Sequence, residues 1–316
     1  MQPESPEKQT LFSVIIPTYN RAEVLQRCLQ DLARQTLDPS RFETIVVDDG
    51  STDRTPALLE AWQRESPYAF QYHRQENQKQ GAARNRGASL ARGHYLIFLG
   101  DDILAAPALL EEHLAFHRQH GASGNTAVLG YIRWAEEIRV TAFMQWIGEM
   151  GWQFGFSLIE DPLDLPFNFF YTSNISLPAE RFRECGGFDL QFREYGWEDI
   201  ELSFRLKDRG MRLVYNPKAL AFHHHPTTVA SFCLRQEKVG YSAVRFYRSQ
   251  PHLKRFLGIG AMPRYGCRKR FLLRWIRTLT EWSERHPWID TSRYYQDLMS
   301  FYYFQGMQKA LRDEPL

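Results

Sequence analysis

The sequence lacks the features that mark several large classes of protein. Its four cysteines are scattered without a Cys-x-x-Cys pair, which argues against a zinc ribbon or a disulfide framework and suits a reducing compartment. No apolar run reaches the length of a membrane-spanning helix. The first ten residues are polar and lack the apolar segment of a signal peptide. These absences predict a cytoplasmic protein.

Two nucleotide-binding motifs are missing as well. No G-x-G-x-x-G follows the first predicted strand, and no G-x-x-x-x-G-K-[ST] occurs anywhere in the chain. A dinucleotide site of the Rossmann type and a P-loop therefore lose their main support. The net charge of +2 is close to neutral and no nucleic-acid-binding module is recognisable, so nucleic acid is not an expected partner.

The near-neutral total hides an uneven distribution of charge. The chain after residue 226 carries 16 Lys and Arg against 7 Asp and Glu, a surplus of +9, so the preceding residues sum to −7. An acidic front and a basic, aromatic tail indicate two functional parts. We expect a flexible leader at 1–10, a main domain at 11–226 with halves at 11–104 and 105–226, and a helical region at 227–316.

Strand and helix patterns alternate through the main domain. The segments at 11–17 and 42–47 have the pattern of strands, and the continuous apolar run at 95–99 is typical of a strand buried on both faces. Helical patterns at 20–35, where Asn20 can provide the cap, and at 55–65 separate them. This alternation predicts an α/β fold with a mostly parallel central sheet flanked by helices, followed by the helical C-terminal region.

Adjacent carboxylates follow the most apolar of these strands. Asp101 and Asp102 come directly after the run at 95–99 and Gly100, and two carboxylates brought together out of water are costly unless a positive group balances them. Ligands of open α/β sheets bind beyond the carboxyl ends of the strands. A divalent cation with oxygen ligands would satisfy the pair; the alternative is a solvated Asp-Asp turn.

The same edge of the sheet can hold a nucleotide without a phosphate cradle. Tyr19 follows the first strand and can stack on a base, while Asp48 or Asp49 after the second strand can accept a hydrogen bond from a base N–H. A turn and helix cap over 48–53 is the alternative. That alternative explains Ser51 but leaves the doubled aspartate unexplained.

Histidines and carboxylates further along the chain are weaker candidates. The spacing of His113, His117 and His120 could place metal ligands on one helix face, but a solvated face is the expectation. The triplet at 223–225 is a candidate metal ligand at a strand end. The pair at 198–199 opens a helical pattern, where the helix macrodipole alone would favour carboxylates.

Together these segments resemble family 2 glycosyltransferases with the GT-A fold over roughly residues 11–226. The resemblance implies transfer of a sugar from a nucleotide-diphosphate donor to an acceptor hydroxyl, usually with inversion, in glycan or polysaccharide biosynthesis. Alternatives are a retaining glycosyltransferase, a nucleotidyltransferase, or a non-catalytic sugar-nucleotide-binding protein. The resemblance rests on VIIPTYN at 14–20, VDDGSTD at 47–53, GAARNRG at 81–87, FLGDD at 98–102 and GWED at 196–199.

The resemblance also implies roles for single residues and a Mn²⁺ or Mg²⁺ cofactor. Gly100 stands where the family often has an acidic residue, so the motif does not decide whether Asp101 or Asp102 supplies the oxygen that binds the metal. A UDP-sugar is the first candidate for the donor. The implied donor-binding residues are Pro17, Tyr19, Asn20, Asp48, Asp49, Arg84 and Asp101. The implied metal ligands are Asp102, Asp101 and His223, with His225 as fallback; Asp199 is the base, with Glu198 beside it, and Trp197 and Asn174 face the acceptor.

The tail lies outside the resemblance. A helical pattern with an apolar run at 271–276 follows the basic residues at 268–270. Such a helix can lie on an anionic membrane surface, close to a lipid-linked acceptor. The alternative is a helical lobe packed on the main domain. The acceptor class therefore stays open among carbohydrate, lipid-linked and protein acceptors.

Overall fold

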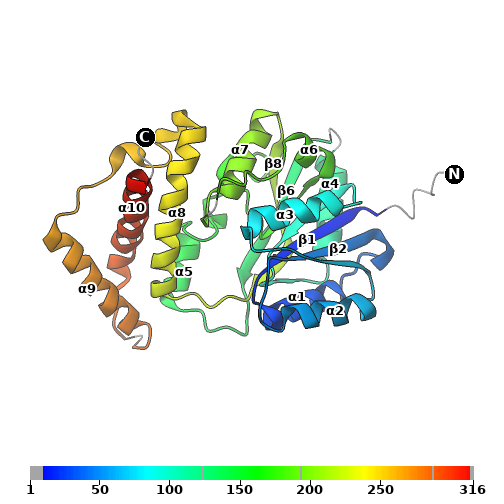
Figure 1. Ribbon diagram of the computed structural model, residues 1–316, viewed down its shortest axis with the longest axis horizontal. Helices are drawn as coiled ribbons and strands as arrows, with labels where there is room; N and C mark the ends of the chain where they lie inside the picture. The colour runs from blue at the N-terminus through cyan, green and yellow to red at the C-terminus, as the bar shows by residue number, and fades with distance from the viewer. Residues whose placement is uncertain (1–9, 122–123, 193, 287, 314–316) are drawn as a thin grey trace. The chain divides into compact units, whose positions relative to one another are not determined.

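The computed structural model describes residues 10–121, 124–192, 194–286 and 288–313. The chain forms two compact units, both drawn in Figure 1. The first takes the chain up to Ile138 together with Leu158–Leu190 and Leu202–His225. The second takes Arg139–Ser157, Gln191–Glu201 and the chain from Pro226 onward.

The first unit is built on one eight-stranded sheet in the order β3-β2-β1-β4-β7-β6-β8-β5. Neighbours β3-β2, β2-β1, β1-β4 and β6-β8 are parallel, whereas β7 is antiparallel to both its neighbours and β5 is antiparallel to β8. This arrangement confirms the predicted α/β class. The strands are β1 Phe12–Thr18, β2 Phe42–Asp48, β3 Ala69–Arg74, β4 Tyr95–Leu99, β5 Ile103–Ala105, β6 Thr126–Trp134, β7 Asn174–Pro178 and β8 Arg212–His223.

Helices cover this sheet, which is why β2 is buried along its whole length. Figure 1 shows α1 and α2 side by side on one side of the sheet and α3 on the other, over β1 and β2. The helices are α1 Ala22–Leu32, α2 Thr55–Glu65, α3 Lys79–Leu90, α4 Leu109–His120, α6 Ala179–Glu184 and α7 Glu198–Asp208, whose first turn belongs to the second unit. Short 3-10 helices lie at Pro39–Arg41, Phe156–Leu158, Phe167–Phe169, Pro251–Lys254, Ile259–Ala261 and Ser292–Tyr294.

Asn20 does not cap the first helix, so that prediction is wrong. The cap residue of α1 is Arg21, and its side chain makes no capping bond. Asn20 instead has a left-handed backbone with φ of 54°, a conformation that asparagine tolerates better than most residues. Its side-chain oxygen accepts hydrogen bonds from the backbone N–H of Thr52 at 2.7 Å and of Asp53 at 3.3 Å. The loop after β1 is thereby tied to the loop after β2.

The expected solvated face of histidines is also wrong, because two of the three lie in the core. His113 and His117 in α4 are buried, and both rings bond to the hydroxyl of Ser176 in β7, at 2.8 Å and 2.7 Å. The other ring nitrogen of His113 lies 2.9 Å from the side-chain oxygen of Asn174. The ring of His117 stacks on Tyr95 with centroids 4.0 Å apart. These contacts attach α4 to the sheet.

These histidines should make the fold labile to mild acid. Burial lowers the pKa of His113 to about 4 and that of His117 to about 3, whereas both titrate near 6.5 when unfolded. Stability is therefore complete above pH 6.5 and is lost as the pH falls toward 4, by on the order of 4 kcal/mol at pH 5. Urea unfolding at pH 7 and pH 5 measures this loss.

A matched pair of variants separates the two histidines from other acid effects. His117→Gln should lose less stability than the wild type between pH 7 and pH 5, because one proton-binding difference has been removed. His120→Gln, at a partly exposed position of the same helix, should keep the wild-type loss. An equal loss in all three proteins would show that other groups cause the acid sensitivity.

A buried carboxylate joins the strands at the end opposite the strand-end loops. Glu43 at the start of β2 has no exposed surface. It accepts hydrogen bonds from the Ser13 hydroxyl at 2.7 Å, the Gln71 amide at 2.9 Å and the Arg92 backbone at 2.8 Å, and it pairs with the Arg92 guanidinium. Burial opposes ionisation, but the bonds from Ser13 and Arg92 outweigh it and lower the pKa of Glu43.

Replacing Glu43 by leucine should strongly destabilise the first unit. The change leaves the buried Ser13 hydroxyl and the Gln71 amide without their acceptor, whereas the exposed Arg92 guanidinium returns to water; each polar group buried without a partner costs about 1–3 kcal/mol. Chemical denaturation measures the change in the free energy of unfolding. Glu65→Leu, at an exposed position at the end of α2, is the control and should cost less than about 0.5 kcal/mol.

The second unit is helical, with two long helices in close contact. Added Cβ atoms at Gly240 in α8 and Gly306 in α10 would lie 1.8 Å from backbone oxygens of the opposite helix, so only glycine allows this approach. Among the helices that the structure describes, none is both long and apolar enough to cross a membrane. The helices are α5 Ala142–Glu149, α8 Val229–Ser249, α9 Cys267–Ser283 and α10 Tyr295–Asp313.

Candidate active site

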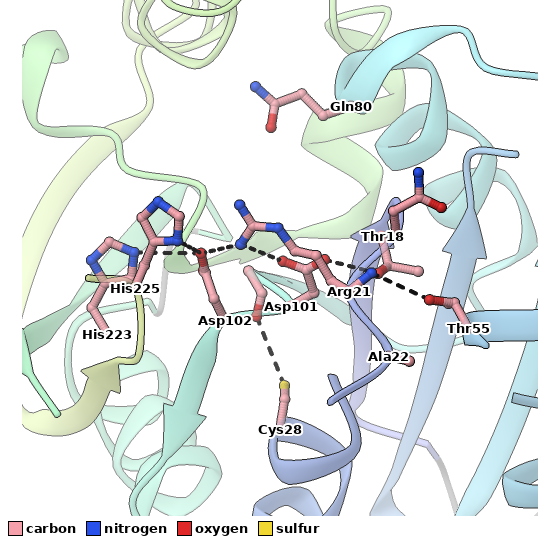
Figure 2. A network of polar contacts seen from close by, with 12 residues as sticks. Thr18, Arg21, Ala22, Cys28, Thr55, Gln80, Asp101, Asp102, His223 and His225 are labelled. Atoms are coloured by element: carbon pink, nitrogen blue, oxygen red, sulfur yellow. Dashed lines mark hydrogen bonds and ion pairs between the residues drawn. The ribbon is translucent and has the colours of Figure 1, made fainter. Parts of the chain in front are cut away.

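At the carboxyl ends of β1 and β4, the guanidinium group of Arg21 lies beside the paired aspartates. The Thr18 hydroxyl donates to Asp101 at 2.8 Å, and one guanidinium nitrogen of Arg21 lies 2.5 Å from Asp102 and 3.4 Å from Asp101 (Figure 2). Arg21 supplies the positive charge that the pair requires. Sequence reasoning missed this residue, although the parallel pairing of β1 with β4 puts the residues after the two strands side by side.

The histidine triplet meets the same aspartate from the other side. The β5-β8 ladder pairs Ile103 with His223, and the imidazoles of His223 and His225 lie 3.5 Å and 3.8 Å from the Oδ2 atom of Asp102 (Figure 2). The ring of His224 instead contacts Arg27 at 2.7 Å. The two predicted histidines therefore come together with Asp102, and the middle one does not.

The two carboxyl groups have opposite pKa shifts. Burial, and next the charge of Asp102, raise the pKa of Asp101 to about 7. Burial also opposes ionisation of Asp102, but the hydrogen bond and charge of His223, together with Arg21, hold its pKa well below the usual range. Asp102 is thus the more acidic member and remains an anion at neutral pH.

The side chains of Asp102 and His223 fit the ligand preferences of a divalent cation. A carboxylate oxygen and imidazole nitrogens suit Mn²⁺, and Mg²⁺ accepts the carboxylate. In the part of the chain that the structure describes, no group of three or more His, Cys, Asp or Glu side chains is placed to hold an ion. Sites completed by substrate phosphates need only one or two protein ligands, so the residues fit such a shared site.

The predicted base-binding aspartates both have partners within the fold. Asp49 accepts hydrogen bonds from the backbone N–H groups of Gln78 and Lys79, each at 2.8 Å, and so holds the start of α3. Asp48 accepts from the Ser51 N–H at 2.8 Å and lies 3.6 Å from the guanidinium of Arg74. The doubled aspartate that the sequence left unexplained thus has a structural explanation.

Other predicted donor residues differ in how accessible they are. Tyr19 is 47% exposed at the end of β1, so its ring is open to stacking, and Pro17 before it is half-buried. Arg84 in α3 is buried, with its guanidinium 5.5 Å from the centre of the Phe188 ring. It also donates to the side chain of Gln80 at 3.3 Å.

Asn174 does not fit the predicted contact with an acceptor. Its side chain has no exposed surface, and its amide nitrogen donates to the backbone oxygen of Ala219 at 2.9 Å. Its oxygen lies within hydrogen-bonding distance of His113. The strand pattern did not reveal this role, because a polar residue on a strand such as β7 is expected to face solvent unless a helix is known to cover it.

The GWED segment lies in the second unit, where its two carboxylates differ. Glu198 is buried and accepts a hydrogen bond from the Gly196 N–H at 3.0 Å, so it fixes the preceding loop. Asp199 is half-buried in the first turn of α7. Trp197 has a φ of 70°, and its indole N–H donates to the backbone oxygen of Val239 at 3.0 Å. Asp199 is therefore the more accessible carboxylate.

Known proteins resemble this chain in sequence and in fold. It is 32% identical over 269 residues to validoxylamine A glucosyltransferase of Streptomyces hygroscopicus subsp. limoneus, with 77% of this chain and 57% of the relative covered. The chain thus spans under two thirds of that relative's length.

Two solved structures share the fold. The mannosyltransferase PcManGT from Pyrobaculum calidifontis, in complex with GDP-Man and Mn²⁺, is 19% identical with a TM-score of 0.61, over 97% of this chain and 88% of its own. S. aureus TarS 1–349 in complex with UDP is 16% identical with a TM-score of 0.56, over 96% and 92%.

Family models match the chain over most of its length. The model for glycosyl transferase family 2 matches residues 13–177, and the model for glycosyl transferase family group 2 matches residues 97–304. The first match includes the strand-end loops that hold Arg21 and the paired aspartates. The chain belongs to glycosyl transferase family 2.

Proposed function

We propose that the chain transfers a sugar from a nucleotide-diphosphate donor to an acceptor hydroxyl, in the biosynthesis of a glycan or polysaccharide. The observation that carries this proposal is the convergence of Arg21, Asp101, Asp102 and His223 at one edge of a family 2 sheet. Relatives of the same fold were solved with GDP-Man and with UDP, which supports nucleotide diphosphates as the donor class. A UDP-sugar is our first candidate.

Asp102 and His223 are the proposed ligands of a divalent cation, Mn²⁺ or Mg²⁺, with His225 as the alternative imidazole. When bound, such a cation offsets the negative charge that develops on the departing diphosphate. Asp101, held by the Thr18 hydroxyl, orients the donor beside it. Arg21 balances the aspartates when no cation is present and remains near the diphosphate as a second positive group.

Donor recognition is assigned to the loops after β1 and β2. The exposed ring of Tyr19, next to Pro17, stacks on the base. Asn20 shapes the loop through its bonds to the residues after Asp49. Asp48 and Asp49 hold the strand-end loops in place through their hydrogen bonds. Arg84 in α3 is the proposed positively charged residue near the sugar and phosphate groups of the donor.

Asp199 is the proposed base that takes the proton of the acceptor hydroxyl as it attacks. An inverting single displacement needs one such base and no covalent nucleophile. Asp199 is half-buried and accepts the Ile200 N–H at 2.9 Å, whereas Glu198 is buried and accepts the Gly196 N–H. Glu198 and Trp197 would then shape the loop that presents Asp199 to the acceptor.

A panel of UDP-, GDP- and dTDP-sugars tests this function, each with Mn²⁺, with Mg²⁺ and with EDTA. Release of nucleoside diphosphate and thermal shift are measured together. We expect one donor to raise the melting temperature only when metal is present, because a ligand that binds the folded state stabilises it. The same donor should release nucleoside diphosphate once an acceptor is added.

The other outcomes separate the alternatives. Binding without turnover on carbohydrate, lipid-linked and protein acceptors would favour a non-catalytic sugar-nucleotide-binding protein. Release of sugar 1-phosphate, the group that leaves when the nucleotidyl group of the donor is transferred, would favour a nucleotidyltransferase. A product whose anomeric configuration is retained, read by NMR, would rule out single displacement and with it the role given to Asp199.

A further inference from the structure

Helix α9 in the second unit presents large apolar side chains to solvent. Phe271 is 75% exposed, Trp275 59%, Leu272 52% and Trp282 50%. At 100° per residue these four side chains fall within an arc of about 100° on one side of the helix. We refer to these four residues as the aromatic face of α9.

The neighbouring side of α9 already provides the contacts that the fold requires. Leu273, Ile276, Thr280 and Ser283 are buried, and α9 packs on α8 and α10 through this side. The helix therefore has a buried side and, next to it, an exposed apolar side. Packing within the unit accounts for the buried face and leaves the aromatic face unexplained.

Positive charge surrounds the aromatic face. Arg268, Lys269, Arg270 and Arg274 all lie in the first half of α9 and are exposed. The acidic side chains of the segment are engaged elsewhere, because Glu281 pairs with Arg277 and Glu284 accepts the N–H of Val229. A partner surface binds this face most favourably if it is both apolar and anionic.

We propose that the aromatic face of α9 docks on an anionic lipid bilayer. Trp and Phe side chains are favoured at the boundary between headgroups and acyl chains, and an amphipathic helix lies in that plane with its apolar face inserted. Lys and Arg beside the apolar face are attracted by anionic headgroups. The aromatic face and its four basic neighbours match both requirements.

A second copy of the chain fits this face less well. A two-fold contact would set the same basic patch against itself, and like charges at an interface oppose association. One face of a 17-residue helix also offers fewer side chains than the 20–30 residues per partner of a standard stable interface. Charge and size therefore both favour a bilayer.

Sedimentation of the full chain with lipid vesicles tests the proposal. Vesicles of phosphatidylcholine with 30 mol% phosphatidylglycerol should bind at least tenfold more protein than phosphatidylcholine vesicles at 0.1 M NaCl. Binding should fall at 0.5 M NaCl, where screening is stronger. Tryptophan emission should shift to shorter wavelength on binding, as the indoles leave water.

Variants assign the binding to α9. The double variant Phe271→Ser/Trp275→Ser should lose at least tenfold in binding while keeping the wild-type melting temperature, because both side chains are exposed. Arg270→Gln/Arg274→Gln should lose the preference for anionic vesicles. Leu158→Ser, at a position 55% exposed outside α9, should bind as the wild type does.

Three results would overturn the proposal. The first is no binding to anionic vesicles, and the second is equal binding by wild type and the double variant. The third is a dimer in sedimentation equilibrium that the double variant abolishes, which would assign the face to a second copy. None of these readouts depends on sugar transfer, so they leave the proposed function untouched.

Discussion

Replacing Asp102 by asparagine is expected to lower kcat/KM for sugar transfer by about a thousandfold or more. The variant keeps the shape of the side chain but loses the anionic oxygen next to His223 and Arg21. A metal contributes several kcal/mol to the stabilisation of a departing diphosphate, and about 4 kcal/mol corresponds to a thousandfold in rate. Initial rates over a Mn²⁺ titration measure the loss.

Metal-dependent donor binding should weaken in the same variant. Calorimetric titration of the donor with and without Mn²⁺ should show a strong metal effect for the wild type and little for Asp102→Asn. Glu60→Gln, at an exposed position in α2, is the control for a lost negative charge. If the variant depended on Mn²⁺ as the wild type does, another residue would have to hold the cation.

The second large effect is expected for Asp199→Asn, which should reduce kcat by about 10²–10⁴-fold. That range is the usual contribution of a general base, and the amide cannot accept the proton of the acceptor hydroxyl. The affinity for the donor should stay within about twofold. Single-turnover rates and donor titrations separate the two quantities.

Asp208→Asn provides the comparison, since it removes an exposed carboxylate from the other end of α7. It should transfer sugar at the wild-type rate. Loss of donor affinity in Asp199→Asn, with the chemical step unchanged in saturating donor, would contradict the assignment of Asp199 as the base and place it on the donor side.

Local patterns were sufficient for the elements that are regular and buried. The apolar runs predicted β1, β2 and β4, and the pattern at 55–65 coincides with α2 Thr55–Glu65. They were insufficient for β5 Ile103–Ala105, which has three residues and exists because β8 pairs with it. They were also insufficient for β7 Asn174–Pro178, whose antiparallel pairing with β4 depends on residues distant in the chain.

The candidate site shows the same division between local and distant information. The adjacent carboxylates of Asp101 and Asp102 predicted a positively charged partner. Only the parallel pairing of β1 and β4 identifies Arg21 as that partner. Burial of His113 and Asn174 likewise depends on how α4 packs on the sheet. The chemistry of a residue can be read from the sequence, but its partner follows from the tertiary fold.

The bonds of Asn20 have a consequence for the thermodynamics of donor binding. Fixing the backbone of a loop residue costs about 1–2 kcal/mol of conformational entropy. Because the Asn20 carboxamide already holds Thr52 and Asp53, that entropy is lost during folding and not when the donor arrives. If the donor binds where we propose, the loops after β1 and β2 meet the nucleotide as a preorganised surface, and rigid sites of this kind keep more of their contact energy as affinity.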